Sequence, residues 1–150
     1  MVESLRLKLK EQKGFTLIEL LAVIVILGII AAIAIPAIGN VIGKTDNKAK
    51  VQDALLIIDA AKLYVADNQV TSSAAPGTET VLTLKGTNSL DSYLDRVKDE
   101  GFEVTVTAVL KDDNTVKYSY KIGKHDAVTV LGQDKATKTV SEKDLSAYKK

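Results

Sequence analysis

Hydrophobic residues are concentrated in the first third of the chain. Residues 20–43 form a run of 24 positions without a charged side chain, and most of them are aliphatic. About 20 apolar residues in a helix suffice to cross the hydrocarbon core of a bilayer. The basic side chains that precede the run favour a cytoplasmic N-terminus, with the rest of the chain outside. The pattern therefore predicts one membrane-spanning helix near the N-terminus.

The helical pattern continues beyond the apolar run, through residues 44–68. Apolar residues recur there at spacings of three and four, while Lys48 and Asp59 mark the opposite side. This predicts an amphipathic helix with one face to bury. A single helix over residues 15–68 would be about 80 Å long, and Pro36 would kink it because proline removes a backbone donor. The apolar positions of the amphipathic part are Val51, Ala54, Leu55, Ile58, Ala61 and Val65.

The pattern after this helix predicts a loop, a short strand and a short helix. Residues 68–80 are rich in Ser, Thr, Ala and Gly, which is typical of a loop. Residues 81–84 predict a strand. Residues 88–101 predict a helix that Asn88 caps and Gly101 ends. The apolar residues expected to face inward from it are Leu90, Leu94 and Val97.

Beyond Gly101 the hydrophobic pattern changes to a period of two. Residues 102–110 and 115–122 alternate apolar and polar side chains, and a KDDN turn separates them, so they predict a β-hairpin. Tyr118 and Tyr120 fall on its apolar face.

Two further strands are predicted over residues 127–131 and 136–140. An antiparallel sheet with one apolar face needs a cover, and the apolar face of residues 44–68 can supply it. The sequence therefore predicts an α+β fold, in which a long N-terminal helix packs on a small antiparallel sheet.

Composition narrows the possible chemistry. The chain has 150 residues, no Cys, one His and a net charge of +1. The lack of Cys excludes disulfides, thiolate metal sites and a Cys nucleophile, and the small net charge gives no support to DNA binding. His125 is predicted to be a solvated loop residue. Residues 112–114 predict a hairpin turn, because the spacing of a full calcium loop is absent. No catalytic residue, metal site or cofactor is predicted.

The most specific motif lies where the basic N-terminus meets the apolar run. Residues 13–19 read KGFTLIE, after a leader with four basic and two acidic residues. The basic leader, the Gly-Phe junction, the acid five residues after the Gly and the proline within the helix together resemble the processing signal of type IV pilins and of pseudopilins. The resemblance covers residues 6–40 closely and the helix to about residue 68 in general character. The last 80 residues share only the helix-plus-sheet plan.

The resemblance implies roles for individual residues. Gly14 would end a cytoplasmic leader, residues 1–14, which a prepilin peptidase removes. Phe15 would become the new N-terminus and be N-methylated. Glu19 would be the fifth residue of the mature chain, and Pro36 would be the proline that distorts the helix in this family.

The resemblance also implies how the rest of the chain is organised. Residues 15–43 would be the transmembrane and assembly half of the helix, residues 44–68 its amphipathic half, and residues 69–150 a globular head. Gly39 and Gly43 form a GxxxG pattern, which can bring helices close together in a membrane. With Pro36 they would make this part of the helix the easiest to stretch.

Glu19 is expected to act in assembly. A carboxylate in lipid is costly, but a nearby cation can offset the cost. The candidate cations are the Phe15 amine of the same chain and that of a neighbouring subunit. A pair between subunits would set their axial register. The alternative is that Glu19 lies at the membrane interface of an ordinary anchor.

The sequence thus predicts a structural subunit, not an enzyme, of a type IV pilus or related filament. Its expected partners are copies of itself, a prepilin peptidase/N-methyltransferase, an assembly ATPase with its membrane platform, and membrane lipid before assembly. The chain would lie in the cytoplasmic membrane before assembly and in a surface filament afterwards. The alternatives are a pseudopilin of a secretion or DNA-uptake machine, a membrane-anchored binding module that never polymerises, and an exported protein cut near Ala34.

Overall fold

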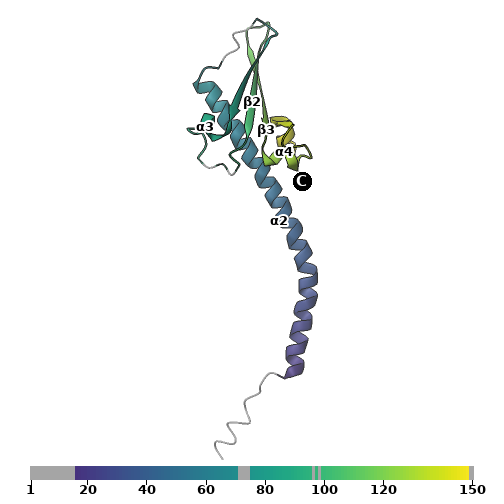
Figure 1. Ribbon diagram of the computed structural model, residues 1–150. Helices are drawn as coiled ribbons and strands as arrows, with labels where there is room; N and C mark the ends of the chain where they lie inside the picture. The colour runs from purple at the N-terminus through teal and green to yellow at the C-terminus, as the bar shows by residue number, and fades with distance from the viewer. Residues whose placement is uncertain (1–15, 71–74, 96, 98, 149–150) are drawn as a thin grey trace, which may run out of the picture. The chain divides into compact units, whose positions relative to one another are not determined.

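The computed structural model describes residues 16–70, 75–95, 97 and 99–148. The chain divides between Ile42 and Gly43 into two compact units. Figure 1 shows the elements and labels α2, α3, β2, β3 and α4. In chain order they are helix α2 (Leu17–Asp67), strand β1 (Glu79–Lys85), helix α3 (Gly86–Leu90), strands β2 (Glu103–Leu110) and β3 (Val116–Gly123), helix α4 (Asp126–Val130), strand β4 (Thr139–Ser141) and helix α5 (Glu142–Ser146).

The long N-terminal helix predicted from the sequence is present. It begins at Leu17 and ends at Asp67, and Pro36 lies inside it without ending it. Gly14 and Phe15 lie outside the described residues. In the first unit, the large aliphatic side chains of this helix are exposed. The described residues therefore give the apolar run no core of its own.

In the second unit, the same helix buries one face. Ala54, Ile57, Ile58 and Ala61 are fully buried, which confirms the amphipathic pattern of residues 44–68. Figure 1 shows this part of α2 alongside strands β2 and β3. A helix and a sheet that each have one apolar face bury both faces by packing together.

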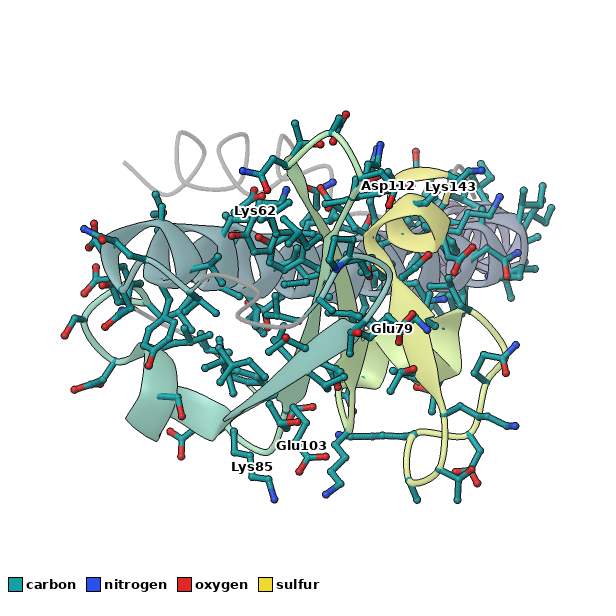
Figure 2. The ribbon with its side chains drawn as sticks, turned by 90° about the horizontal axis from the view of Figure 1, so that it is seen from above. Lys62, Glu79, Lys85, Glu103, Asp112 and Lys143 are labelled. Carbon is teal, nitrogen blue, oxygen red and sulfur yellow. The ribbon has the colours of Figure 1, made fainter. Side chains whose placement is uncertain are left out.

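The sheet has four antiparallel strands in the order β1-β2-β3-β4. The predicted hairpin is strands β2 and β3, with residues 112–114 in the turn between them. Val104, Val106 and Ile122 face the core. Tyr118 and Tyr120 are half-buried on the same face, as predicted. On the other face, Lys85 of β1 pairs with Glu103 of β2 at 3.3 Å; both residues are labelled in Figure 2.

The predicted helix over residues 88–101 is wrong. The helix there is α3, which is only five residues long, begins at Gly86 and ends at Leu90. Asn88 lies inside it rather than capping it, and Gly101 lies in the turn before β2. A short helix without a side-chain cap has little stability of its own, because forming the first turn is unfavourable and a few hydrogen bonds do not compensate for it. The expected inward packing holds nevertheless: Leu90 is buried, and Leu94 and Val97 pack partly against the core.

The predicted strand over residues 127–131 is also wrong. The segment is helix α4, with Ala127 and Val128 fully buried. Its β-branched residues suggested a strand, but tertiary packing overrides such a weak preference over five residues. The fourth predicted strand, residues 136–140, is β4 at Thr139–Ser141. Helix α5 was not predicted; Ser141 and Asp144 start it with a capping box.

Candidate assembly site

Glu19 lies in the first turn of α2 and bonds to the residue that precedes the helix. The Thr16 backbone N–H donates to Glu19 Oε2 at 2.8 Å, and the Thr16 hydroxyl donates to the same oxygen at 3.0 Å. In return, the Glu19 N–H donates to Thr16 Oγ1 at 3.3 Å. This reciprocal arrangement is a capping box, which satisfies backbone donors that the helix leaves without a partner.

The role of Thr16 was not predicted from the sequence. The signal was present, because a Thr followed three residues later by Glu before an apolar run is the pattern of a capping box. Both hydrogen bonds from Thr16 end on Oε2, and Glu19 is exposed. The carboxylate can therefore cap its own helix and still accept a further donor.

The apolar surface around Glu19 is continuous along the first unit. The large aliphatic side chains from Leu17 to Ile42 are between 46% and 87% exposed. Helix α2 is long enough and apolar enough to cross a membrane. A surface of this kind needs lipid or another apolar surface to cover it, because exposed apolar area is unfavourable in water.

Besides Glu19, the predicted site residues that the structure describes lie further along α2. Pro36 is 17 residues after Glu19, which is about 25 Å along a helix. A Cβ atom added at Gly39 or at Gly43 would meet no heavy atom within 4 Å. These glycines therefore leave the helix backbone open to close approach, but they form no common site with Glu19.

His125 was predicted to be a solvated loop residue, and this prediction is wrong. Its side chain is 1% exposed and caps helix α4: Nδ1 accepts from the Ala127 N–H at 3.1 Å. Since Nδ1 is the acceptor, Nε2 carries the proton of the neutral ring and donates it to Asp53 Oδ2 of α2 at 3.3 Å. Asp53 is 72 residues away in the sequence, so no local pattern could have revealed this contact.

An ion-pair cluster lies close to His125. Lys135 Nζ donates to Asp99 and to Asp126, each at 2.7 Å. Partial burial raises the pKa of Asp99, but the Lys135 ammonium and the Gly101 N–H hold the ionised carboxylate, so its pKa lies below the ordinary value. The two carboxylates raise the pKa of Lys135. Among the described residues, no group of three His, Cys, Asp or Glu side chains could hold a metal ion. The ion pairs of Lys135 join the segment at Asp99 to the start of helix α4.

Comparison with known proteins decides the family. A sequence model of the prokaryotic N-terminal methylation motif matches residues 9–35. A fimbrial protein of Pseudomonas aeruginosa is 32% identical over 136 residues, which are 91% of this chain and 82% of that protein. The chain belongs to the type IV pilin and pseudopilin family.

Two other relatives show the breadth of this family. The type II secretion system core protein G of Vibrio cholerae serotype O1 is 38% identical over 84 residues, 54% of this chain and 55% of that protein. The type IV major pilin protein PilE of Neisseria gonorrhoeae is 36% identical over 97 residues, 64% of this chain and 56% of that protein. The chain thus spans about half the length of these two relatives. No solved structure matches the chain.

Proposed function

We propose that this protein is a structural subunit of a type IV pilus or a related filament, and that it has no enzymatic activity of its own. The observation that carries the proposal is the exposed apolar surface of residues 17–42, headed by the motif that contains Glu19. In this proposal the surface is covered by lipid before assembly and by other copies of the chain afterwards. The similarity to a fimbrial protein over 91% of this chain and 82% of that protein supports it.

The proposal includes processing of the N-terminus. A prepilin peptidase/N-methyltransferase cuts between Gly14 and Phe15 on the cytoplasmic side and methylates the Phe15 amine. Residues 15–43 then anchor the chain, residues 44–68 continue the helix, and residues 69–150 complete the head outside. An assembly ATPase and a membrane platform drive polymerisation. The intact mass of the protein from its native cells tests this step: it should correspond to a chain that begins at Phe15 and carries one methyl group, and a chain that begins near Ile35 would contradict it.

Glu19 acts between subunits in this proposal. Its carboxylate pairs with the Phe15 amine of a neighbour and so sets the axial register of the two helices. Without Glu19, that amine would be left unpaired in an apolar bundle, where an unpaired charge is costly. Pro36, Gly39 and Gly43 allow the helix to stretch and to pack closely with other copies.

The capping box complicates this interpretation, because Glu19 could matter only as a helix cap. Three variants separate the two roles. Glu19→Val removes the cap and the charge; Glu19→Gln keeps a capping side chain but removes the charge; Thr16→Ala weakens the cap but keeps the charge. Sheared filaments and membranes are separated, and this protein is measured in each fraction.

Charge pairing predicts a specific ranking of filament yield. Glu19→Val and Glu19→Gln should both lose filaments while the protein remains in the membrane and is still cut after Gly14. Thr16→Ala should retain most of the yield. Normal filaments from Glu19→Gln would show that Glu19 acts as a cap, and normal filaments from Glu19→Val would contradict any role in assembly.

A pseudopilin of a secretion machine is the second candidate function. The similarity to the core protein G of a type II secretion system favours it. Both functions predict a filament, so the Glu19 experiment tests what they share. Loss of surface filaments without loss of protein export, on deletion of the gene, would favour the pilus.

A further inference from the structure

Strand β1 forms one edge of the sheet, and the middle of this edge is open. Just beyond the strand, the Gly86 N–H donates to the Phe102 carbonyl at 2.8 Å. Backbone groups in an antiparallel ladder alternate between the two sides of a strand, so those of Val81 and Thr83 point away from β2. Among the described residues, nothing bonds to these outward groups. Val81 and Thr83 are called here the open edge, and their free N–H and C=O groups can accept another strand.

The open edge lacks the features that usually protect an edge strand from pairing. Such edges are commonly short, charged or interrupted by proline. The opposite edge of the sheet follows this rule: β4 has three residues, and Lys117 is exposed on the stretch of β3 that β4 leaves unpaired. Strand β1 has seven residues, and its central five, TVLTL, include neither a charge nor a proline. Its Val81 is 57% exposed, so β1 is suited to receive a partner strand.

The charges of β1 are self-complementary. Glu79 begins the strand and Lys85 ends it; both are exposed, and both are labelled in Figure 2. In the described part of the chain Glu79 forms no ion pair, and Lys85 contacts Glu103 at 3.3 Å. If two copies of β1 pair antiparallel with Leu82 opposite Leu82, each Glu79 lies opposite Lys85 of the other copy. Opposite charges at directly facing positions stabilise such a pair.

The hydrogen-bonding pattern favours the same register. With Leu82 at the centre, Val81 of one copy lies opposite Thr83 of the other. Both residues point their backbone groups outward, so each facing pair can exchange two hydrogen bonds. A shift of two residues in either direction would keep backbone bonds but separate Glu79 from Lys85. An extended peptide of another protein would also fit an open edge, but it would not require the two ends of β1 to match each other.

We propose that β1 is a docking edge for β1 of a second copy of this chain, and that this second copy belongs to another filament. The inference rests on the proposed function. A strand that pairs antiparallel with itself requires a two-fold axis between the two copies, whereas successive subunits of a filament are related head to tail. The contact therefore joins filaments side by side, by merging two sheets into one.

A single contact of this kind is weak, and its effect depends on repetition. The Lys85 N–H already donates to Ser89 Oγ at 3.4 Å, so only Val81 and Thr83 of each copy supply the backbone bonds. Two short paired strands have little stability by themselves. Along two adjacent filaments, however, many copies of the contact form together, and their combined affinity far exceeds that of one contact. Separate heads therefore stay monomeric, whereas filaments associate.

Disulfide crosslinking between filaments tests the partner and the register. The chain contains no Cys, so an introduced cysteine reports on its own position alone. Full-length chains with Val81→Cys or Thr83→Cys are assembled separately, and the sheared filaments are mixed and mildly oxidised. In the proposed register these two positions face each other with their Cα atoms about 5.5 Å apart, which suits a disulfide. The mixture should give severalfold more disulfide-linked dimer than either population alone.

Ser119→Cys provides the matched control, because Ser119 is also exposed on a strand but lies on β3. Filaments with Val81→Cys mixed with filaments with Ser119→Cys should give no more dimer than either alone. Any excess there would show that β1 meets β3 and would overturn the inference. No excess of dimer from Val81→Cys with Thr83→Cys, or a disulfide to another protein in its place, would also overturn it.

A second measurement follows filament association by low-speed centrifugation, which sediments bundles but leaves single filaments in solution. Thr83→Pro removes an outward N–H without touching the bonds to β2, so it should lower the sedimented fraction severalfold. Thr83→Ala keeps the N–H and should leave the fraction unchanged. The total yield of sheared filaments controls for folding. Equal sedimentation of these two variants, both forming filaments, would overturn the inference.

Charge reversal gives an independent test that does not alter the backbone. Filaments with Glu79→Lys and filaments with Lys85→Glu should each sediment less than wild type, because like charges then face each other. A mixture of the two should sediment again, since each charge now meets its opposite. Unchanged sedimentation of both unmixed variants, or wild-type filaments that stay single, would overturn the inference while leaving the proposed function in place. A wild-type chain that forms no filaments with its assembly machinery present would refute both.

Discussion

The two halves of α2 have similar secondary structure but opposite relations to the rest of the chain. From Leu17 to Ile42 the large aliphatic side chains are exposed, whereas Ala54, Ile57, Ile58 and Ala61 are fully buried. Both halves make their backbone hydrogen bonds within the helix, apart from the groups at its two ends. The difference is in what covers the side chains: the head supplies its own cover, and the N-terminal half requires one from outside. One helix can therefore belong to a folded unit at one end and to an assembly at the other.

The largest expected effect is on solubility. Residues 43–150 expressed alone should be a soluble monomer that unfolds cooperatively, because the buried face of α2 and the sheet cover each other. The full-length chain should require detergent or lipid. Size-exclusion chromatography checks whether residues 43–150 are soluble and monomeric, and thermal unfolding followed by circular dichroism checks whether they unfold cooperatively. The same chromatography, with and without detergent, checks the full-length chain. Aggregation of residues 43–150, or unfolding without a cooperative transition, would contradict the contrast between the two halves.

The second largest effect is expected from an Ile→Ala substitution, made once in each half of α2. Ile58→Ala should lower the free energy of unfolding of the head by about 2–5 kcal/mol, because it leaves a cavity at a fully buried position. Ile26→Ala, at a position that is 57% exposed, should change it by less than about 0.5 kcal/mol. Urea unfolding of the full-length chain in mild detergent measures both. Equal losses would mean that the first unit contributes to the stability of the head.

A smaller effect is expected at His125, which joins α4 to α2 within the head. His125→Ala should cost about 1–3 kcal/mol, because the Ala127 N–H would be left buried without an acceptor. His125→Asn should recover part of this loss, since asparagine can accept a hydrogen bond at the start of a helix. Urea unfolding of residues 43–150 gives the ranking. If Asn is no better than Ala, the cap does not account for the role of His125.

The smallest effect is a pH dependence at Asp99. Its pKa is lower in the folded chain than in the unfolded one, so ionised Asp99 adds stability above its unfolded pKa of about 3.9. That stability is lost as the pH falls through the folded pKa. Asp99→Asn should therefore cost about 1 kcal/mol at pH 7 and progressively less below about pH 4. Urea unfolding of residues 43–150 at several pH values checks this, and a cost that is independent of pH would contradict it.

The sequence was most informative about the candidate site. The motif at residues 13–19 pointed to Gly14, Phe15 and Glu19, because a processing signal is a short contiguous segment; the roles of these residues stay predictions. Thr16 could also have been found, since the spacing of a capping box is local. Leu56 and Leu63 are different: both leucines are visible in the sequence, but their exposure became known only once the sheet was placed on the opposite face of the helix.

Long regular patterns in the sequence predicted the fold correctly, whereas short patterns did not. The helical period of residues 44–68 and the alternation in β2 and β3 extend over enough residues to determine helix, hairpin and buried face. Residues 127–131 were predicted as a strand and form α4, because five residues carry too weak a preference to resist their surroundings. His125 was predicted to be solvated and is buried, because its partner Asp53 is distant in the sequence. Periodicity is a local property that the sequence states directly, whereas the burial of a short segment depends on which distant elements close over it, and only the tertiary structure decides that.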